Sequence, residues 1–556
     1  MVAGGALGAL LLVVLTGGRA PERLAAERFV AAWARGDYPA MHAELTEDDR
    51  RATPVRRFRA AYRRAATTAT ATAYRPGAVG DLRDGVVRVP MTVTTRVFGT
   101  IRATLRLPFA DEGDARRLAW SPNLVFPGLA RGERLTRRTR LPRRADILAR
   151  DGSVLAEGRD RSSPIEEVAS SIVGELGAPP PERLDGLREL GYPADATVGT
   201  SGLERVFERR LAGTPGGQLR AGSRILALTA PRPAQAVRSS IAPGVQRAAV
   251  DAKGDRVGGV AVMRPRTGEI LALAGIAFSG LQPPGSTFKI VTLTGVLEAD
   301  LAGPSSKFPV QTKTTIEGVE LENANGEACG GTLRYSFAHS CNSVFAPLGA
   351  KLGAQRLVRA AEQFGFNADP GIPGAATSTI PPASEIGDDL AVGASAIGQG
   401  RVQATALQMA WVAATIAAGG QRPRLTLERG LPPRRTQVVE PGVARTVGRL
   451  MEAVVSEGTG TAARISGVRV AGKTGTAELR DTSTPSCVPS PDPAAAPCPP
   501  AAADDPTDTD AWFAAYAPAG RPRVAVGVLL VQAGVGGETA APVAKQALVA
   551  GLKATR

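Results

Sequence analysis

The chain has 556 residues, enough for three or four domains, and its 43% hydrophobic and 21% charged residues exclude a wholly disordered protein. Aromatic residues make up only 4%, so we expect cores of alanine, valine and leucine. The net charge is +15, and the basic residues are 59 arginines and eight lysines, with no lysine before Lys253. In such a chain, a lysine is present either by chance or because arginine could not do the same chemistry. Arginine stays protonated and so cannot act as a base, whereas lysine can.

The chain contains two histidines, His42 and His339. This scarcity disfavours Ser-His-Asp and Cys-His enzymes and excludes metal sites built from several histidines. If the protein is a hydrolase or an acyl transferase, its base is therefore expected to be a lysine. We predict neither a metal nor a cofactor.

Residues 2–18 form an uncharged apolar run that Arg19 ends. The run is short for a membrane span of about 20 residues but within the tolerated range. It lacks the basic start and the clean cleavage site of a signal peptide. We predict an uncleaved membrane anchor over residues 1–20, with the catalytic part outside the cytoplasm; a buried core helix is the alternative.

The four cysteines fall into two close pairs, Cys329 with Cys341 and Cys487 with Cys498, and no C-x-x-C motif occurs. Two local disulfides in an oxidising compartment are expected, with four reduced structural thiols as the alternative. The second pair lies in a Pro/Ala/Asp-rich loop over residues 478–510 that is too polar to pack by itself.

In chain order, the first elements indicate a small α+β domain over residues 21–130. An amphipathic helix is predicted over 21–45, followed by strand-like alternation over 85–109 and 118–129. The apolar face of the helix is expected to comprise Leu24, Phe29, Val30, Trp33 and Met41.

A second, strand-rich domain is predicted over residues 131–235, with a proline turn at 179–181 and a helix over 201–213. The basic segment near its start has no interleaved aromatic residues, so we interpret it as a solvated surface near anionic lipids or polymers and expect no nucleic-acid binding. The third domain, residues 236–556, is expected to begin with a helix over 241–252 and a hairpin over 258–275 that turns at 266–268.

Three short motifs in the third domain contain chemically useful residues. Ser286-Thr-Phe-Lys289 is the only S-x-x-K in the chain, and it follows loop-forming residues at the predicted start of a buried helix. A serine and a lysine one turn apart share a helix face, and a desolvated lysine has a lowered pKa that lets it accept the serine proton. A helix cap with a solvated lysine is the alternative.

The second motif, Ser340-Cys341-Asn342, places a hydroxyl and a carboxamide two residues apart in a loop between predicted helices. A second S-x-N, which begins at Ser121, is interpreted as a chance match. The third motif, Lys473-Thr474-Gly475-Thr476, lies in an apparent strand. A cation, flanking hydroxyls and a glycine that allows close approach suit an edge strand that binds a carboxylate substrate.

Taken in this order, the three motifs resemble those of penicillin-binding proteins and serine β-lactamases. The whole chain after the anchor resembles a monofunctional, class B penicillin-binding protein of the actinobacterial type. The resemblance implies a multidomain α+β protein: a membrane anchor, an NTF2-like domain, a β-rich pedestal or dimerisation domain, and a transpeptidase domain with an antiparallel sheet, flanking helices and an all-α lobe. Ala145, Ala149 and Ala406 depart from the common family pattern outside the catalytic set.

The resemblance also implies roles for the motif residues. Ser286 is the expected nucleophile and Lys289 its base, and Ser340 with Lys473 is expected to return a proton to the leaving D-Ala. Thr474, Gly475 and Thr476 are expected to bind the substrate, with the backbone N–H groups of Ser286 and Thr476 as the oxyanion hole. Asn342 is expected to bind the substrate backbone or to position Lys289. His339 is interpreted as structural.

The expected activity is a D,D-transpeptidase that cross-links peptidoglycan stem peptides and is acylated by β-lactams. The expected partner is a glycosyltransferase in the plasma membrane. The alternatives are a β-lactam-binding sensor or scaffold, a D,D-carboxypeptidase and a β-lactamase. A β-lactamase is usually about half this length and needs a deacylation base, and no E-x-x-L-N motif is present.

Overall fold

The computed structural model describes residues 20–479 and 509–556, which form two compact units. Unit 1 comprises the described residues up to 144 together with 178–197 and 212–234, and unit 2 comprises 145–177, 198–211 and the rest from 235. The predicted anchor, Cys487 and Cys498 lie outside the described residues. Within them, no helix is both long and apolar enough for a bilayer crossing.

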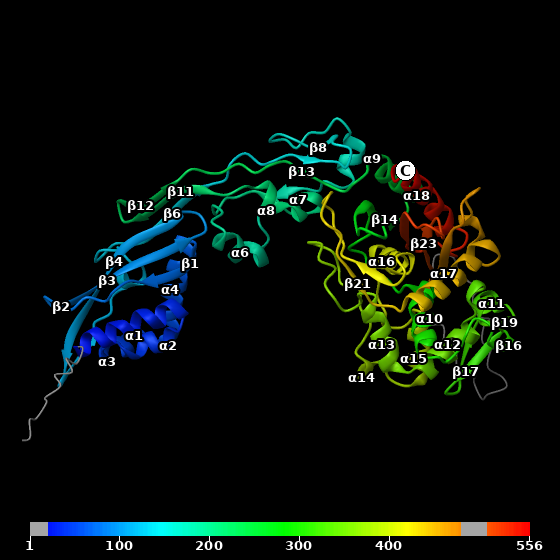
Figure 1. Ribbon diagram of the computed structural model, residues 1–556, viewed down its shortest axis with the longest axis horizontal. Coiled ribbons are helices and arrows are strands. Elements are labelled where there is room, and N and C mark those ends of the chain that lie inside the picture. Colours follow the sequence, from blue (N-terminus) through cyan, green and yellow to red (C-terminus); the bar gives the residue numbers. More distant parts are fainter. Residues whose placement is uncertain (1–19, 480–508) are drawn as a thin grey trace, which may run out of the picture. The chain divides into compact units, whose positions relative to one another are not determined.

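Unit 1 begins with four helices, of which α1 and α4 pack on one face of an antiparallel sheet (Figure 1). The strands run in the order β1-β3-β4-β5, and β2 pairs with β3. The elements are α1 (Pro21–Arg35), α2 (Tyr38–Ala43), α3 (Glu47–Ala52), α4 (Val55–Ala69), β1 (Ala71–Pro76), β2 (Leu82–Arg83), β3 (Val86–Thr95), β4 (Thr100–Glu112) and β5 (Ala115–Leu118). The core between helices and sheet contains most of the chain's N-terminal aromatic residues.

Three expectations for this region were wrong. The single helix over 21–45 is two helices, because Gly36 ends α1 in the left-handed conformation and Asp37 caps α2 by accepting from the Ala40 N–H. Leu24 is 37% exposed and so is not part of the apolar face. The stretch 118–129 is not a strand beyond Leu118, since its proline starts a 3₁₀ turn, η1 (Pro122–Val125).

The stretch 131–235 contributes to both units. In unit 1 it supplies a three-stranded sheet of order β12-β11-β6 and a short helical segment. These elements are β6 (Leu135–Arg140), η2 (Pro181–Arg183), α6 (Leu184–Glu189), β11 (Gly216–Ala221) and β12 (Arg224–Thr229). The helix expected over 201–213 is two short helices in unit 2.

The same stretch and the residues just after it give unit 2 several small elements. They are β7 (Ile147–Leu148), β8 (Val154–Ala156), α5 (Glu166–Ser170), β9 (Leu176–Gly177), β10 (Val198–Gly199), α7 (Gly202–Val206), α8 (Glu208–Leu211) and β13 (Val237–Arg238). Arg150 in this part forms a 3.0 Å ion pair with the buried Glu269. The Gln246 side chain donates to the Ser171 hydroxyl. These contacts join the small elements to the main body of unit 2.

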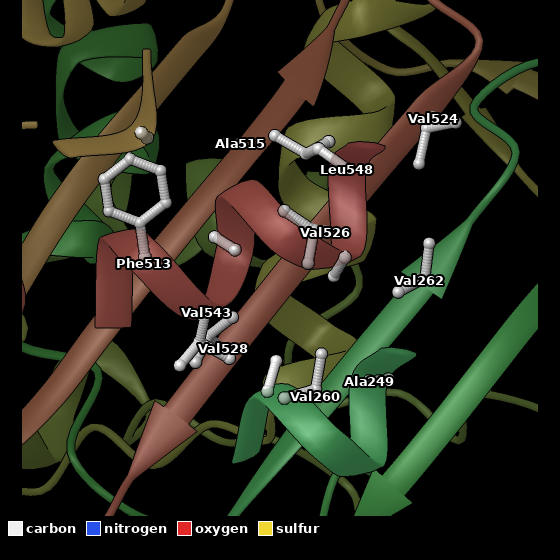
Figure 2. Close-up of a cluster of buried hydrophobic side chains, with 14 of the residues drawn as sticks. Ala249, Val260, Val262, Phe513, Ala515, Val524, Val526, Val528, Val543 and Leu548 are labelled. Carbon is white, nitrogen blue, oxygen red and sulfur yellow. The ribbon is translucent and has the colours of Figure 1, made fainter. Parts of the chain in front are cut away.

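The main body of unit 2 is built on an antiparallel sheet of order β15-β14-β24-β23-β22. Its strands are β14 (Gly258–Met263), β15 (Ile270–Gly275), β22 (Ala471–Glu478), β23 (Thr509–Ala517) and β24 (Val524–Leu530). The predicted hairpin over 258–275 is confirmed, with Gly268 at positive φ in its turn. On one face, α9 (Pro243–Lys253) and α18 (Ala540–Ala554) pack against small apolar side chains; Figure 2 shows Val526 and Val528 on the strands facing Val543 and Leu548 on α18.

The other face of this sheet is covered by α16 (Ala406–Ala417), which contacts β14, β23 and β24. The chain that follows β14 and β15 forms a largely helical lobe. Its elements are η3 (Gly285–Phe288), α10 (Lys289–Glu298), β16 (Lys307–Gln311), β17 (Lys313–Ile316), β18 (Val319–Glu322), η4 (Ala324–Gly326), β19 (Cys329–Thr332), α11 (Leu333–Ala338), α12 (Asn342–Leu352), α13 (Ala354–Gln363), α14 (Ala383–Ile386) and α15 (Asp389–Ala396). The last elements before β22 are β20 (Gln421–Pro423), β21 (Arg435–Gln437), α17 (Pro441–Ser456) and η5 (Thr461–Ala463).

Candidate active site

The turn that holds Ser286 packs directly on the edge strand β22. A Cβ on Gly475 would lie 2.8 Å from the carbonyl oxygen of Pro284, and a Cβ on Gly285 would lie 2.5 Å from that of Thr476. Both contacts are too close for a side chain, so glycine is required on each side. Among the strands that the structure describes, β22 pairs only with β23, so its other edge is left to face η3. Ser286 is thereby brought beside the Lys473-Thr474-Gly475-Thr476 strand.

Lys289 begins α10, one turn after Ser286, and its side chain is fully buried. Its side-chain nitrogen Nζ donates to the Asn342 side-chain oxygen and to the Ser340 backbone carbonyl, both at 2.7 Å. It also lies 3.3 Å from the Ser340 hydroxyl oxygen. The structure therefore joins the first two motifs through one buried amine.

The Ser340 hydroxyl lies between two lysines. Lys473 Nζ is 2.8 Å from the Ser340 Oγ, against 3.3 Å for Lys289 Nζ. Lys473 is also fully buried, and it donates to the Thr474 backbone carbonyl at 2.9 Å. One hydroxyl thus connects the amines of the first and third motifs, which is the geometry that a proton relay needs.

Ser340 has a φ of +62°, a left-handed conformation that is uncommon for residues other than glycine. The surrounding chain holds it there: the Cys341 N–H donates to the Ser336 carbonyl, and the Ser340 N–H donates to that of Phe337. Cys341 is joined by a disulfide to Cys329 on β19. Backbone strain of this kind persists where neighbouring contacts determine the conformation, and it is frequent at active sites.

Burial changes the proton affinity of both lysines. Desolvation lowers the pKa of Lys289 well below its usual value, and the charge of Lys473 lowers it further. Burial alone lowers the pKa of Lys473 to about 7. Because desolvation disfavours the charged form, the Lys289 amine is poised to be neutral and can accept a proton.

The hydroxyls of the third motif also have partners. The Thr474 Oγ1 lies 2.6 Å from the Thr459 Oγ1, and the Gly536 N–H donates to the Thr476 Oγ1 at 3.4 Å. Sequence reasoning missed Thr459, which follows α17 in a Gly-Thr-Gly turn. In the sequence, only the two glycines on either side of Thr459 indicate a turn here. Turns of this kind are too common to identify a functional site.

The other sequence candidates lie apart from this cluster. His339 stacks on Tyr335 with ring centroids 4.0 Å apart. The S-x-N in unit 1 is a local contact in which the Ser121 hydroxyl donates to the Asn123 side-chain oxygen. Across residues 20–479 and 509–556, no three His, Cys, Asp or Glu side chains converge as metal ligands would.

Comparison with known proteins agrees with this geometry. Residues 258–549, which contain all three motifs, match the penicillin-binding protein transpeptidase domain. The chain belongs to the penicillin-binding protein family. Residues 156–223 match the penicillin-binding protein dimerisation domain, and residues 21–133 match the NTF2-like N-terminal transpeptidase domain. The protein is therefore a multidomain α+β penicillin-binding protein with these three domains.

Its relatives include peptidoglycan D,D-transpeptidase PbpA of Mycolicibacterium smegmatis, which is 33% identical over 66% of this chain and 82% of that protein. The corresponding PbpA of Mycobacterium tuberculosis is 30% identical over 57% and 72% of the two chains. Among solved structures, a penicillin G acyl-enzyme complex of the M. tuberculosis protein has a TM-score of 0.56 at 27% identity and covers 74% of this chain and 99% of that one. A D,D-transpeptidase domain from Eggerthella lenta has a TM-score of 0.58 at 28% identity, with coverage of 76% and 99%.

Proposed function

We propose that this protein is a peptidoglycan D,D-transpeptidase that cross-links stem peptides through an acyl-Ser286 intermediate and is acylated by β-lactams. The observation that carries the proposal is the position of the Ser340 hydroxyl within hydrogen-bond reach of both Lys289 and Lys473. The names of the relatives, peptidoglycan D,D-transpeptidases, and the β-lactam acyl-enzyme neighbours support it. A serine with a buried, neutral amine one turn away is the arrangement that activates a hydroxyl nucleophile.

In the first half-reaction, the Ser286 hydroxyl attacks the carbonyl carbon of the penultimate D-Ala, and its proton passes to the neutral Lys289. The backbone N–H groups of Ser286 and Thr476 stabilise the developing oxyanion. The carbon–nitrogen bond then breaks, and Ser340, assisted by Lys473, delivers a proton to the departing D-Ala amine. The product is an ester on Ser286 and free D-Ala.

In the second half-reaction, an amine from a neighbouring stem peptide attacks the ester carbonyl and loses its proton to the same relay. The new amide is the cross-link, and Ser286 regains its hydroxyl. Thr474 and Thr476, beside Lys473, hold the terminal carboxylate of the donor stem. Asn342 orients Lys289, which donates to its side-chain oxygen at 2.7 Å.

We further infer that residues 1–20 anchor the protein in the plasma membrane with both units outside the cytoplasm, and that a membrane glycosyltransferase supplies its glycan substrate. The apolar composition of residues 2–18 supports the anchor. The proposed domains are 21–130, 131–235 and 236–556, and the close agreement of the first with the matched range 21–133 supports that boundary.

The decisive experiment is labelling with a fluorescent penicillin, wild type beside Ser286→Ala. We expect the variant to lose all covalent label while its melting temperature stays within about 2 °C of wild type, because the change removes one hydroxyl group from a side chain that is only partly buried. Label on the Ala variant would refute Ser286 as nucleophile. Incubation of the wild type with two stem peptides, followed by mass spectrometry, separates a cross-linked product from simple hydrolysis.

A further inference from the structure

One face of the unit 1 sheet is not covered by any helix in the part of the chain that the structure describes. Along β3 the side chains alternate, with Val87, Val89 and Met91 buried toward the helices and the residues between them facing out. The same alternation holds for β4. We use the name open face for eight outward-facing residues of β1, β3 and β4: Arg75, Arg88, Pro90, Thr92, Thr94, Arg102, Thr104 and Arg106.

The open face is basic and contains no acidic group. Its four arginines are exposed, and none forms an ion pair or side-chain hydrogen bond with another of the described residues. Strands β1 and β3 have no aspartate or glutamate at all. The two acids of β4, Asp111 and Glu112, lie at its far end and pair with Arg116 and Arg117. The positive charge of this face is therefore not neutralised by the described residues of the unit.

The register of the sheet places two of these arginines directly against each other. Arg88 on β3 is paired with Arg106 on β4, and like charges opposite one another destabilise a sheet. Thr92 lies between Arg75 and Arg102 in a row across the three strands. A chain under selection for stability alone gains nothing from this arrangement, whereas an anion bound between the guanidinium groups would remove the repulsion.

We propose that the open face binds a linear phosphodiester polymer of the cell envelope. The guanidinium fork matches phosphate oxygens with two parallel hydrogen bonds, and the threonine hydroxyls add neutral donors between the charges. Neighbouring strands are about 4.8 Å apart, and alternate residues of one strand are about 7 Å apart, so the arginines offer a grid of sites rather than one pocket. A grid of this kind suits repeated phosphates along a flexible chain.

A lipid bilayer is the less favoured occupant. Protein surfaces that bind a bilayer interface place large apolar side chains among the basic residues. Several large apolar residues of the protein are exposed, but none of them belongs to the open face. The surface can therefore attract anionic groups but has nothing to insert between lipids. The proposal does not depend on the catalytic assignment.

The test measures binding of a fluorescent poly(glycerol phosphate) oligomer to the full chain at several salt concentrations. We expect Arg88→Gln/Arg106→Gln to bind at least tenfold more weakly at low salt, with the slope of log K against log salt smaller by about 1.4, because two phosphate contacts are lost. The matched control is Arg56→Gln/Arg63→Gln on the exposed side of α4, which removes the same charge and should bind within about twofold of wild type.

Equal losses in the two double variants would overturn the proposal, because they would show that only net charge matters. Tighter binding of the wild type to phosphatidylglycerol vesicles than to the oligomer would overturn it in favour of a lipid surface. A second readout is thermal stability: Arg88→Gln should raise the melting temperature, since it removes the opposed charge, and leave penicillin labelling unchanged. A lower melting temperature for this variant would contradict the repulsion on which the argument rests.

Discussion

The hydroxyl oxygens of Thr459 and Thr474 lie 2.6 Å apart. The Thr459 N–H also donates to the carbonyl of Ala338 at 3.1 Å, two residues before Ser340. A Cβ on Gly458 would lie 2.1 Å from that same carbonyl oxygen, so the turn fits closely against the end of α11. Thr459 therefore connects the segment that holds Ser340 with the strand that holds Lys473, and we assign it a positioning role.

Thr459→Val should slow acylation by a β-lactam about three- to tenfold, since one hydrogen bond of about 0.5–1.5 kcal/mol that orients the relay is lost. Stopped-flow measurement of the acylation rate checks this. Thr461→Val, on an exposed residue of the same loop, should leave the rate unchanged, and Thr459→Ser should restore most of it. A purely structural role for Thr459 would lower the melting temperature without this selective effect on rate.

Lys289→Arg should reduce the acylation rate by about 10² or more, because arginine stays protonated and cannot accept the Ser286 proton. The measurement is the second-order rate constant for a chromogenic β-lactam. Lys351→Arg, at an exposed position near the end of α12, is the matched control and should leave this rate constant unchanged. A Lys289→Arg rate close to wild type would refute Lys289 as the base.

The stability of the protein should rise with pH above neutrality through Lys473. Its pKa is about 7 in the folded state and near 10.5 when exposed, so the unfolded chain binds more protons between these values. The cost of burying this amine is fully present below about pH 7 and disappears toward pH 10.5. Lys289, whose pKa is also lowered, acts in the same direction.

Urea unfolding at pH 7, 8 and 9 measures this effect. Lys473→Met should show a smaller increase in unfolding free energy over the series than the wild type, because it removes the titration of Lys473 and the part of the Lys289 pKa shift that the Lys473 charge causes. Lys545→Met, at an exposed lysine of α18, should match the wild-type slope. Parallel slopes for the wild type and Lys473→Met would contradict the lowered pKa.

The Cys329–Cys341 disulfide should stabilise both the fold and the site. It closes a short loop, for which the chain-entropy model gives about 3 kcal/mol, and it ends one residue after the strained Ser340. Cys329→Ser should lower the melting temperature and the acylation rate, while Cys487→Ser should affect neither much. Equal effects of the two substitutions would refute the coupling to Ser340, and thiol titration of the unfolded, unreduced protein should find no free cysteine.

The position of a truncation should decide whether unit 2 keeps its activity. Unit 2 includes residues 145–177 and 198–211, so a chain starting near residue 235 would lose Arg150 and leave the buried Glu269 without one of its partners. A chain starting at residue 145 keeps this ion pair. We expect the longer piece to be acylated at close to the full rate and the shorter one to melt at a lower temperature. Complete loss of acylation in a folded longer piece would contradict our expectation that residues 21–130 are not needed for the acylation chemistry.

The chemistry of the site could be predicted from the sequence because it depends on residue types at short spacings. Ser286 and Lys289 are one turn apart wherever the fold places their segment. The chain has only eight lysines, so the presence of Lys289 and Lys473 in the motifs is informative. Local turns were predictable for the same reason, as at Gly268. The continuous helix over 21–45 was a wrong prediction, since amphipathic spacing continued past Gly36 while the conformation of that glycine ended the helix.

The contacts between the three motifs, and the pKa values of their lysines, were decided only by the tertiary structure. Lys289 and Asn342 are far apart in sequence, and their 2.7 Å contact exists because α10 and α12 pack in one lobe. The lowered pKa values of Lys289 and Lys473 follow from burial, which no local pattern specifies. The role of Thr459 likewise arises from the contact of its loop with β22, and the pairing of Arg88 with Arg106 arises from the strand register. A hydrogen bond or a repulsion depends on distances, and only the folded chain sets these distances.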